Sequence, residues 1–447
     1  MRVLRSAAVF VVLALGAAAC VFPAPPNPGV PVNTHQIPAN IASGATCDPG
    51  LPDVSAQIQA WIDSLPNGAT ARLAPGRCYR TELPVMVRAK TNFTVDGNGS
   101  TLRAFTDGCQ DQSNDGISYN NCTFLPPVNT HVVNWPRNRS RFYVRGNRNV
   151  TIRNIKLDGG HPHPGLRDDS YVAALEAQHA FDLGENNRGV TIDGVRADRV
   201  YGDYVYVADS HDVMVRNSVF GEDNGANSGN GRQGFTVVNG TNITFANNRV
   251  MNVRRSHIDI EPLSTGAVIR DIFIDNNTFG AARLGWFSNH PYGNANPVIE
   301  NVFVRGNTLA GKPFDVSIGM GTVSPPNPND PATYRRRNYQ FIDNTSNQSG
   351  GSPQGALMMI VGVDGVVVRG NKTRVQPGRV PRMALVEIKQ SRAIQVIDNQ
   401  TLGAEQTGRY ATSASGAALL NAAVCERGNT VGNPLVARPD PSIPVCL

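Results

Sequence analysis

Long hydrophobic runs are scarce in this 447-residue chain, and the apolar stretch from Ala7 through Leu15 is too short to cross a bilayer as a helix. No Cys-x-x-Cys pair is present, so the cysteine spacing gives no sign of zinc or redox chemistry. Only five of the 41 basic residues are lysine, and no basic run is long enough to indicate nucleic-acid binding. Arginine therefore dominates the net charge of +6, and arginine binds carboxylates and sulfates in a bidentate manner.

The first residues predict export. A basic start, an apolar run and small residues describe a secretory signal over residues 1–19. Cys20 follows three alanines and resembles the lipidated cysteine of a bacterial lipobox, although Ala17 stands where such boxes usually carry leucine. Ordinary cleavage after the alanines is the alternative. Residues 20–45 read as a proline-rich spacer, so we expect either a secreted protein or a cell-surface lipoprotein that meets a membrane only through its lipid.

The remaining six cysteines support export, because an even number suits disulfide bonding in an oxidising compartment. Each of them lies among turn residues, which disfavours the alternative of buried free thiols. Proximity in the sequence suggests the pairs Cys47–Cys78, Cys109–Cys122 and Cys425–Cys446, but spacing alone does not choose among the other connectivities.

A short motif recurs along most of the chain: two apolar residues flank a third residue, one or two polar residues follow, and an asparagine comes next. The second apolar residue of each motif serves as its anchor, and the anchors lie 23 to 40 residues apart at Ile152, Ile192, Val215, Phe245, Ile274, Val304, Phe341, Val368 and Val396. Helical periodicity is nearly absent after residue 90, so the units read as short strands. Since one unit cannot bury its apolar face alone, the repeat predicts a solenoid of stacked coils.

The asparagines three residues after the anchors have a structural explanation. We expect them to occupy tight turns in the left-handed conformation and to stack their amides from coil to coil. Several also form glycosylation sequons, but the turn chemistry explains them without glycosylation. They are Asn248, Asn277, Asn307, Asn344, Asn371 and Asn399.

These features resemble the pectin lyase-like superfamily of right-handed parallel β-helix proteins. The resemblance covers roughly residues 92–403, and it extends to a candidate capping helix over Val54–Ile62 and to the stretch LAPGRCY at Leu73–Tyr79, which is similar to a first-strand motif of that superfamily. It implies an all-β, single-stranded right-handed parallel β-helix, with an N-terminal cap and first coil over residues 46–91 and a C-terminal cap over residues 404–447. An antiparallel sandwich is the alternative, but it would need shorter, hairpin-like spacing.

A second strand precedes each anchor, and these strands align as one stacked sheet. Because strand side chains alternate, one set of residues should point inward: Val205, Val207, Phe235, Val237, Ile258 and Ile260. The other set should point outward: Tyr204, Tyr206, Thr236, His257, Asp259 and Glu261. On the next coil the outward residues are either Trp286, Ser288 and His290 or Phe287 and Asn289. Adjacent coils are ~4.8 Å apart, so the outward residues should form one patch.

The composition of this patch suits a polysaccharide, because aromatic faces stack on sugar rings and charged groups bind hydroxyls. The loops His161–Ala177, Gly221–Gly231 and Thr322–Arg337 should wall the groove. The predicted substrate contacts are Tyr204, Tyr206, Arg232, Gln233, Arg255, Trp286, Asn289, His290, Glu222 and Asp223. Glu222 and Asp223 are also candidates for a second acid, with ordinary solvation as the alternative.

Asp259 and Glu261 are the candidate catalytic residues. Two residues apart on one strand face, their Cβ atoms should lie ~6.5 Å apart, so repulsion should raise one pKa. Glycosidic cleavage needs such a pair, with one carboxyl protonated and the other ionised. His257 is a candidate general base, proton shuttle or substrate contact. The structural alternative is a ladder in which Arg232, Arg254 and Arg255 neutralise both acids.

Three function classes remain open. The catalytic motifs of polygalacturonases, pectate lyases and mannuronan epimerases are absent as sets, so no family catalytic residue is carried over. A glycoside hydrolase is favoured, and the alternatives are a lyase or C5 epimerase acting on a uronate polymer and a non-catalytic glycan-binding surface protein. We expect a monomer with a polysaccharide partner and no cofactor. No calcium-type acid cluster is evident, and a metal at His161, His163, Asp168 and Asp169 is only weakly indicated.

Overall fold

The computed structural model describes residues 33–105, 140–160, 176–222, 231–282, 285–289, 297–310, 315–319, 326, 330–349, 358–374, 384–402, 409–413, 422–432, 435–437 and 443–447. The chain divides into Met1–Val32 and Asn33–Leu447, and every described residue belongs to the second unit. The predicted signal, Cys20, the Cys109–Cys122 pair, Asp223, His290 and the candidate metal ligands in the loop after residue 160 lie outside the described residues. Within the described ranges, no helix has the length and apolar character needed to span a membrane.

Three parallel ladders of strands make up the described fold. The first ladder contains β4 (Val85–Arg88), β7 (Phe142–Arg145), β10 (Phe181–Gly184), the first part of β13 (Val205–Arg216), the first part of β15 (Phe235–Ala246), β17 (Ser256–Ile260), β20 (Gly285–Asn289), β23 (Val316–Ile318), β26 (Met358–Val361), β29 (Ala384–Lys389) and β32 (Arg409–Ser413).

The second ladder contains β1 (Asn33–Gln36), β2 (Ala69–Arg72), β5 (Thr91–Asp96), β8 (Arg148–Arg153), β11 (Asn187–Asp193), the later parts of β13 and β15, β18 (Val268–Asp275), β21 (Val298–Arg305), β24 (Arg336–Ile342), β27 (Val363–Arg369), β30 (Arg392–Ile397) and β33 (Ala422–Arg427).

The third ladder contains β3 (Cys78–Arg80), β6 (Thr101–Arg103), β9 (Lys156–Asp158), β12 (Arg196–Asp198), β14 (Val219–Phe220), β16 (Arg249–Val253), β19 (Thr278–Ala282), β22 (Thr308–Leu309), β25 (Thr345–Ser349), β28 (Lys372–Arg374), β31 (Gln400–Leu402) and β34 (Thr430–Gly432). Here β35 (Leu435–Ala437) pairs with β34 in the antiparallel sense.

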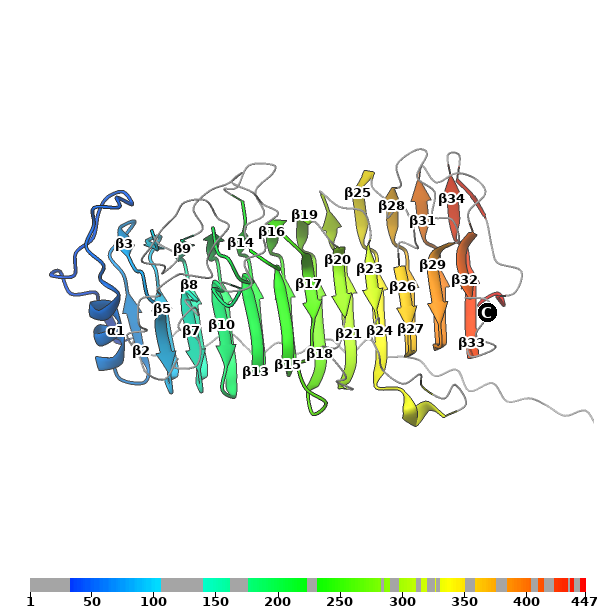
Figure 1. Ribbon diagram of the computed structural model, residues 1–447, viewed down its shortest axis with the longest axis horizontal. Coiled ribbons are helices and arrows are strands. Elements are labelled where there is room, and N and C mark those ends of the chain that lie inside the picture. Colours follow the sequence, from blue (N-terminus) through cyan, green and yellow to red (C-terminus); the bar gives the residue numbers. More distant parts are fainter. Residues whose placement is uncertain are drawn as a thin grey trace, which may run out of the picture. The chain divides into compact units, whose positions relative to one another are not determined.

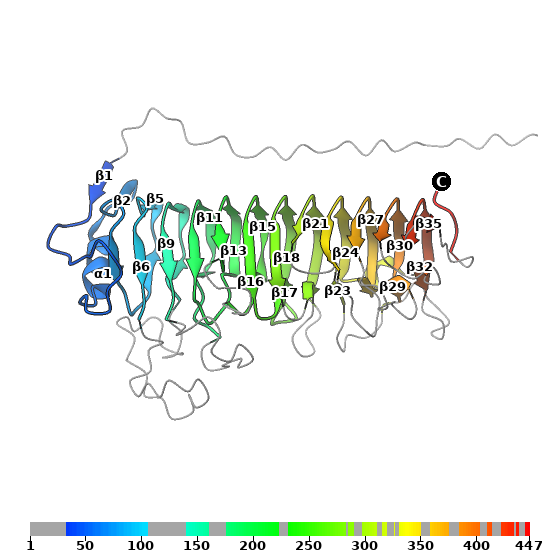
Figure 2. The same cartoon turned by 90° about the horizontal axis from the view of Figure 1, so that it is seen from above.

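Successive coils stack in sequence order, with α1 at one end of the stack and β32 to β34 at the other (Figures 1 and 2). Each coil contributes strands to the first, second and third ladders in turn, so neighbours within a ladder come from consecutive coils and run parallel. This arrangement is the predicted right-handed parallel β-helix. The parallel pairing extends before residue 92, through β2 and β3, and after residue 403, through β32 to β34.

The core follows the predicted strand alignment. Phe181, Val205, Phe235, Ile258 and Phe287 are register partners in the first ladder, and all five are buried. Such a column buries one large apolar side chain per coil. Each buried side chain stabilises the folded state by about 1.5–3 kcal/mol. The β-branched and aromatic residues of the repeat therefore explain both the strands and their stacking.

The predicted asparagine ladder is confirmed, but the left-handed backbone conformation lies one residue earlier than predicted. In this ladder, for example, the Asn277 amide Nδ2 donates to the Phe245 carbonyl at 2.9 Å, and its backbone N–H donates to Asn307 Oδ1 at 2.9 Å. The left-handed conformation belongs instead to the preceding residue, such as Asn247 with φ 57° and Asn276 with φ 55°. That residue makes the turn and leaves the next side chain free to point inward.

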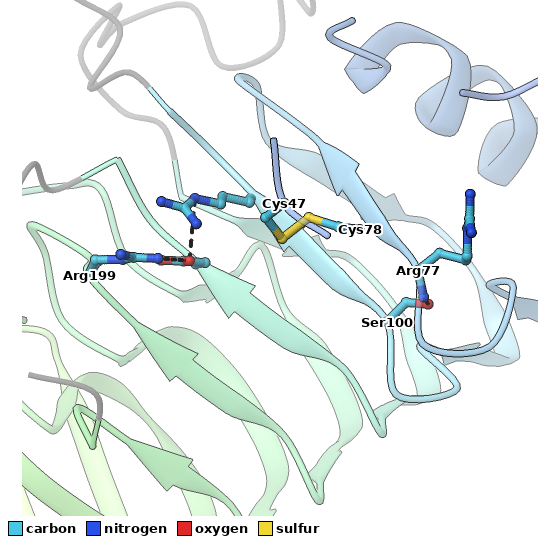
Figure 3. The surroundings of a disulfide bond; sticks show 7 residues. Cys47, Arg77, Cys78, Ser100 and Arg199 are labelled. Carbon is cyan, nitrogen blue, oxygen red and sulfur yellow. Dashed lines mark hydrogen bonds and ion pairs between the residues drawn. A yellow bond between two sulfur atoms is a disulfide. The ribbon is translucent and has the colours of Figure 1, made fainter. Parts of the chain in front are cut away.

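Both ends of the solenoid carry a predicted feature. Helix α1 (Ser55–Ser64) buries Ile58, Trp61 and Ile62 and agrees with the predicted capping helix. The Cys47–Cys78 disulfide is confirmed; it joins the segment before α1 to β3, close to where the Arg77 N–H donates to Ser100 Oγ on the next coil at 2.9 Å (Figure 3).

At the other end, the predicted Cys425–Cys446 bond joins β33 to the final residues. The stretch Leu73–Tyr79, by contrast, is mainly the turn between β2 and β3, with φ 61° at Gly76, and only its last two residues belong to a strand.

Candidate functional site

The predicted patch lies on the outward face of the first ladder, where β10, β13, β15, β17 and β20 pair. Its central column consists of Asp182, Tyr206, Thr236, Asp259 and Ser288, which are register partners on successive coils. These residues alternate with the buried core column, so the predicted outward direction of Tyr206, Thr236 and Asp259 is confirmed. The column is nevertheless largely covered, because Thr236 is fully buried and only 5% of Asp259 is exposed.

Tyr204 and His257, which we expected to point outward, are instead buried in the core, and so is Trp286, for which the outward direction was one of two alternatives. Each one directly precedes an inward residue of the first ladder and packs toward the third ladder. The Tyr204 ring lies 5.4 Å from that of Phe220, and the His257 and Trp286 rings lie 5.1 and 6.1 Å from that of Phe279.

Two consecutive residues therefore face inward where the chain turns between ladders, and the alternation expected of a strand fails at this corner. Gly234 occupies the same corner position just before β15, and a Cβ there would meet the His257 carbonyl oxygen at 2.4 Å. The predicted roles of Tyr204 and Trp286 as exposed stacking residues, and of His257 as a groove base, are accordingly wrong.

Asn289 is a further correction. Ser288 faces outward on its coil, whereas Asn289 is buried in an inward column between Ile260 and Ile318. Its amide donates to the Ile260 carbonyl at 2.9 Å, and its Oδ1 accepts from the Tyr339 hydroxyl at 2.9 Å. Asn289 therefore satisfies polar groups inside the solenoid and does not face a substrate.

A second row of side chains lies beside the outward column and comes from the turn before each strand. It contains His179, Asp203 and Gln233, whose backbones stack through bonds such as Tyr204 N–H to the Gln233 carbonyl at 3.0 Å. Gln233 Oε1 lies 2.7 Å from Thr236 Oγ1, three residues later. The His179 ring stacks on the Tyr206 ring at 4.6 Å.

Sequence reasoning missed His179, Asp182 and Asp203 as members of the site. The signal was present as polar residues spaced by three on consecutive coils: His179 with Asp182, Asp203 with Tyr206, and Gln233 with Thr236. We missed this signal because we applied the inward–outward alternation of strand side chains to the residues of the turn as well.

Arg232 links the carboxylates of the cluster. Its Nη2 donates to Glu261 Oε2 at 3.1 Å, and its Nη1 lies 3.9 Å from both Asp203 Oδ2 and Glu176 Oε2. The arginine–carboxylate pairing that we gave as the structural alternative is thus present at Glu261. Burial alone would lower the pKa of Arg232, but Asp203, Glu261 and Glu176 together raise it above its usual value.

Asp259 and Asp203 are the two carboxyls that burial affects most. Burial, then the nearby Glu261 and Asp203, raise the pKa of Asp259 to about 8, while Arg232 and a hydrogen bond from Ser288 oppose the rise. Gln233 Nε2 donates to Asp259 Oδ2. Asp203 is fully buried, which raises its pKa as well. The expected pKa rise is therefore present, with burial rather than repulsion as its main cause.

The flanking groups have defined charge states. Burial lowers the pKa of His179 to about 4, and its Nδ1 accepts the Asp203 backbone N–H at 2.8 Å, so a neutral ring carries its proton on Nε2. Asp182 pairs with Arg145 at 2.8 Å. Burial also raises the pKa of the Tyr206 phenol, which keeps Tyr206 neutral at physiological pH.

Other predicted residues lie apart from this cluster or at its edge. Glu222 pairs with Arg196 at 3.3 Å and Arg249 at 3.1 Å beside the third ladder, away from Asp259. Arg255 is half-buried and stacks by its backbone on Arg232. Glu387 pairs with Lys389 at 2.9 Å on β29, several coils from Asp259. Across the described ranges, no group of three or more His, Cys, Asp or Glu residues is arranged to hold a metal ion.

Comparison with known proteins supports the fold. No family model and no curated protein matches the sequence. The A-module of the Azotobacter vinelandii mannuronan C-5 epimerase AlgE6 is similar with a TM-score of 0.58 and 15% identity, covering 89% of this chain and 93% of that one. The Streptococcus pneumoniae surface protein and adhesin PfbA gives a TM-score of 0.54 and 14% identity over 81% and 96% of the two chains.

A family 28 exopolygalacturonase from Yersinia enterocolitica gives a TM-score of 0.51 and 13% identity over 88% and 78% of the two chains. At these identities the likeness establishes the fold and nothing finer. It supports the parallel β-helix fold.

Proposed function

We propose that this protein is an exported glycoside hydrolase that cleaves a polysaccharide at the cluster around Asp259 and Glu261. The observation that carries the proposal is the unequal environment of these two acids. Asp259 is buried with its pKa raised to about 8, whereas Glu261 is partly exposed and paired with Arg232 at 3.1 Å. Hydrolysis of a glycosidic bond needs this division into one protonated acid and one carboxylate.

In this mechanism Asp259 gives its proton to the glycosidic oxygen as the bond to the sugar carbon breaks. The Glu261 carboxylate then takes a proton from the attacking water or attacks the sugar carbon itself, and the net reaction adds one water across the bond. Arg232 stabilises the charge on Glu261. Tyr206, Glu176, Arg255 and Ser288 are partly exposed around the acids and are the candidate substrate contacts.

Export is part of the proposal, because disulfides such as Cys47–Cys78 and Cys425–Cys446 persist in an oxidising compartment. The lyase or epimerase alternative loses support from the geometry, since His257, the candidate general base, is buried in the core. A non-catalytic glycan-binding role keeps specific support, because Glu261 is ion-paired and Asp259 is bonded to Gln233.

Incubation of the full chain with a panel of neutral and acidic polysaccharides tests the proposal. New reducing ends without the ultraviolet absorbance of an unsaturated uronate indicate hydrolysis. Appearance of that absorbance would assign the site to elimination instead. Retained glycan binding without either product would favour the binding role and contradict the hydrolase.

A further inference from the structure

Four buried side chains on three consecutive coils form a continuous chain of polar contacts. Thr236 Oγ1 lies 2.9 Å from Asp203 Oδ2 and 2.7 Å from Gln233 Oε1, and the other end of the Gln233 amide contacts Asp259 Oδ2. Asp203 comes from the turn before β13, Gln233 from the turn before β15, Thr236 from the start of β15, and Asp259 from β17. The chain therefore joins the two carboxyls of the cluster whose charge is most disfavoured by burial.

The number of hydrogens in this chain restricts the charge of the two acids. Three contacts need three donated hydrogens. The Thr236 hydroxyl supplies one. The Gln233 amide supplies one more, because its amino end contacts one member of the chain, Asp259, while its carbonyl end can only accept. Ionised carboxylates donate none. If both acids were ionised, two oxygen atoms would face each other at hydrogen-bond distance without a hydrogen between them.

Two proton arrangements complete the chain. In one, protonated Asp203 donates to Thr236, Thr236 donates to Gln233 Oε1, and Gln233 Nε2 donates to an ionised Asp259. In the other, protonated Asp259 donates to Gln233 Oε1, the reversed amide donates to Thr236, and Thr236 donates to an ionised Asp203. The orientation of the Gln233 amide is thus tied to which acid carries the proton, and the two orientations differ only in the placement of nitrogen and oxygen.

We infer that Asp203 and Asp259 hold a proton between them at neutral pH, and that Asp203 is a positioning residue that sets the protonation of Asp259 through Thr236 and Gln233. The catalytic meaning of this inference rests on the proposed function, but the shared proton does not.

The surrounding charges are consistent with a proton in the chain. Arg232 hydrogen-bonds to Glu261 and lies 3.9 Å from Asp203, which is longer than a hydrogen bond. The other titratable or charged groups facing the chain are Glu176, His179, Asp182, Tyr206, Arg255 and Glu261.

Infrared titration of the full chain, with aspartate labelled at the carboxyl carbon, tests the inference without any substrate. The wild type should keep a protonated-aspartate band at neutral pH. Asp203→Asn supplies a permanent donor to Thr236, so Asp259 can ionise with the chain intact, and the midpoint of the band should fall by at least about one pH unit, or about tenfold in proton affinity. Absence of the band in the wild type would overturn the inference.

Variants of Thr236 separate the contact chain from simple proximity. In a Thr236→Ser background the effect of Asp203→Asn should persist, and in a Thr236→Val background it should shrink, because the connection is broken. Thr244→Val, on the same strand but on the second ladder, is the matched control and should leave the band unchanged. Equal effects of Asp203→Asn in the wild-type, Thr236→Ser and Thr236→Val backgrounds would exclude a role for the Thr236 contacts.

The activity assay then distinguishes the two proposals. If a hydrolysed glycan is found, Asp203→Asn should move the alkaline limb of the pH–rate profile to lower pH. If no glycan is hydrolysed but the band behaves as described, the shared proton stands and the hydrolase proposal fails. If hydrolysis is found without the band, the hydrolase stands and the inference fails. Should Asp203→Asn not fold, the wild-type band still tests the shared proton, and Thr236→Val should shift the midpoint of that band more than Thr236→Ser, which keeps the hydroxyl.

Discussion

Two corners of the solenoid are lined by buried polar side chains stacked from coil to coil: the corner after the second-ladder strands from β15 to β33, and the corner before the first-ladder strands β10, β13 and β15. In the first corner the residue is asparagine on coil after coil, and each amide meets the same partners, as Asn277 and Asn307 do. In the second corner the residue changes from His179 to Asp203 to Gln233. A neutral, self-complementary residue is sufficient to satisfy a buried turn, so the changing and acidic corner indicates a purpose other than stability.

Replacing Asp259 or Glu261 should have the largest effect of all, and that effect should be on activity. Asp259→Asn and Glu261→Gln keep shape but remove the proposed acid and its carboxylate partner, so hydrolysis of a responsive glycan should fall by about 10²–10⁴-fold. Asp198→Asn is the matched control, since Asp198 is also buried and pairs with Arg196 at 3.0 Å on the third ladder. Rates per folded molecule, with folding checked by circular dichroism, decide the outcome. Unchanged rates in both variants would remove the acids from the mechanism.

Replacing a ladder asparagine should affect stability and leave the chemistry intact. Asn307→Ala removes the acceptor of the Asn277 N–H and the donor to the Ile274 carbonyl, and leaves both groups buried. The apparent free energy of unfolding in urea should fall by about 2–4 kcal/mol. Gln395→Ala, at an exposed second-ladder position, should change it by less than about 0.5 kcal/mol. A large loss of activity per folded molecule in Asn307→Ala would show that the two corners are not separate in function.

The pH dependence of stability should distinguish the buried acid Asp259 from the ladder asparagines. Because the folded-state pKa of Asp259 is raised to about 8, the folded protein keeps a proton that the unfolded chain loses near its ordinary value of about 4. Stability is then greatest below the unfolded pKa and falls as pH rises toward the folded pKa, by at most about 1.4 kcal/mol per pH unit.

Asp259→Asn should flatten this slope, whereas Asn307→Ala should lower stability by the same amount at every pH. Urea titrations across this pH range measure both effects. A wild-type slope that Asp259→Asn leaves unchanged would mean that another group is responsible for it.

The sequence was sufficient to predict the solenoid, because its physical cause is written into every coil. The anchors, the inward residues such as Phe235 and Ile258, and the stacked asparagines all follow from burial and turn chemistry repeated along the chain. The two disulfides within the described part of the chain likewise follow from sequence proximity.

The site was predicted only in part, because it forms at a corner where strand periodicity ends. Asp259, Glu261, Arg232 and Gln233 were identified correctly as neighbours, since they lie on or beside the strands themselves. The alternation rule placed Tyr204 on the wrong side because the residue at the corner packs against the third ladder. It also passed over Asp203, which the turn brings back toward Thr236. Finding Asp203 would have required knowing how the turn before β13 aligns its side chains with those of the strand that follows.

Glu222→Gln should have the smallest effect and marks the edge of the cluster. The Glu222 side chain remains about one-third exposed and pairs with Arg196 and Arg249 beside the third ladder. Exposed pairs of this kind contribute about 0.2–1 kcal/mol, so the free energy of unfolding should change by no more than that. Hydrolysis, and the protonated-aspartate band of the Asp203–Asp259 chain, should match the wild type because no contact joins Glu222 to those acids within the described residues. A drop in activity comparable with that of Glu261→Gln would mean that substrate reaches across the third ladder, and that the cluster on the first ladder is only part of the binding surface.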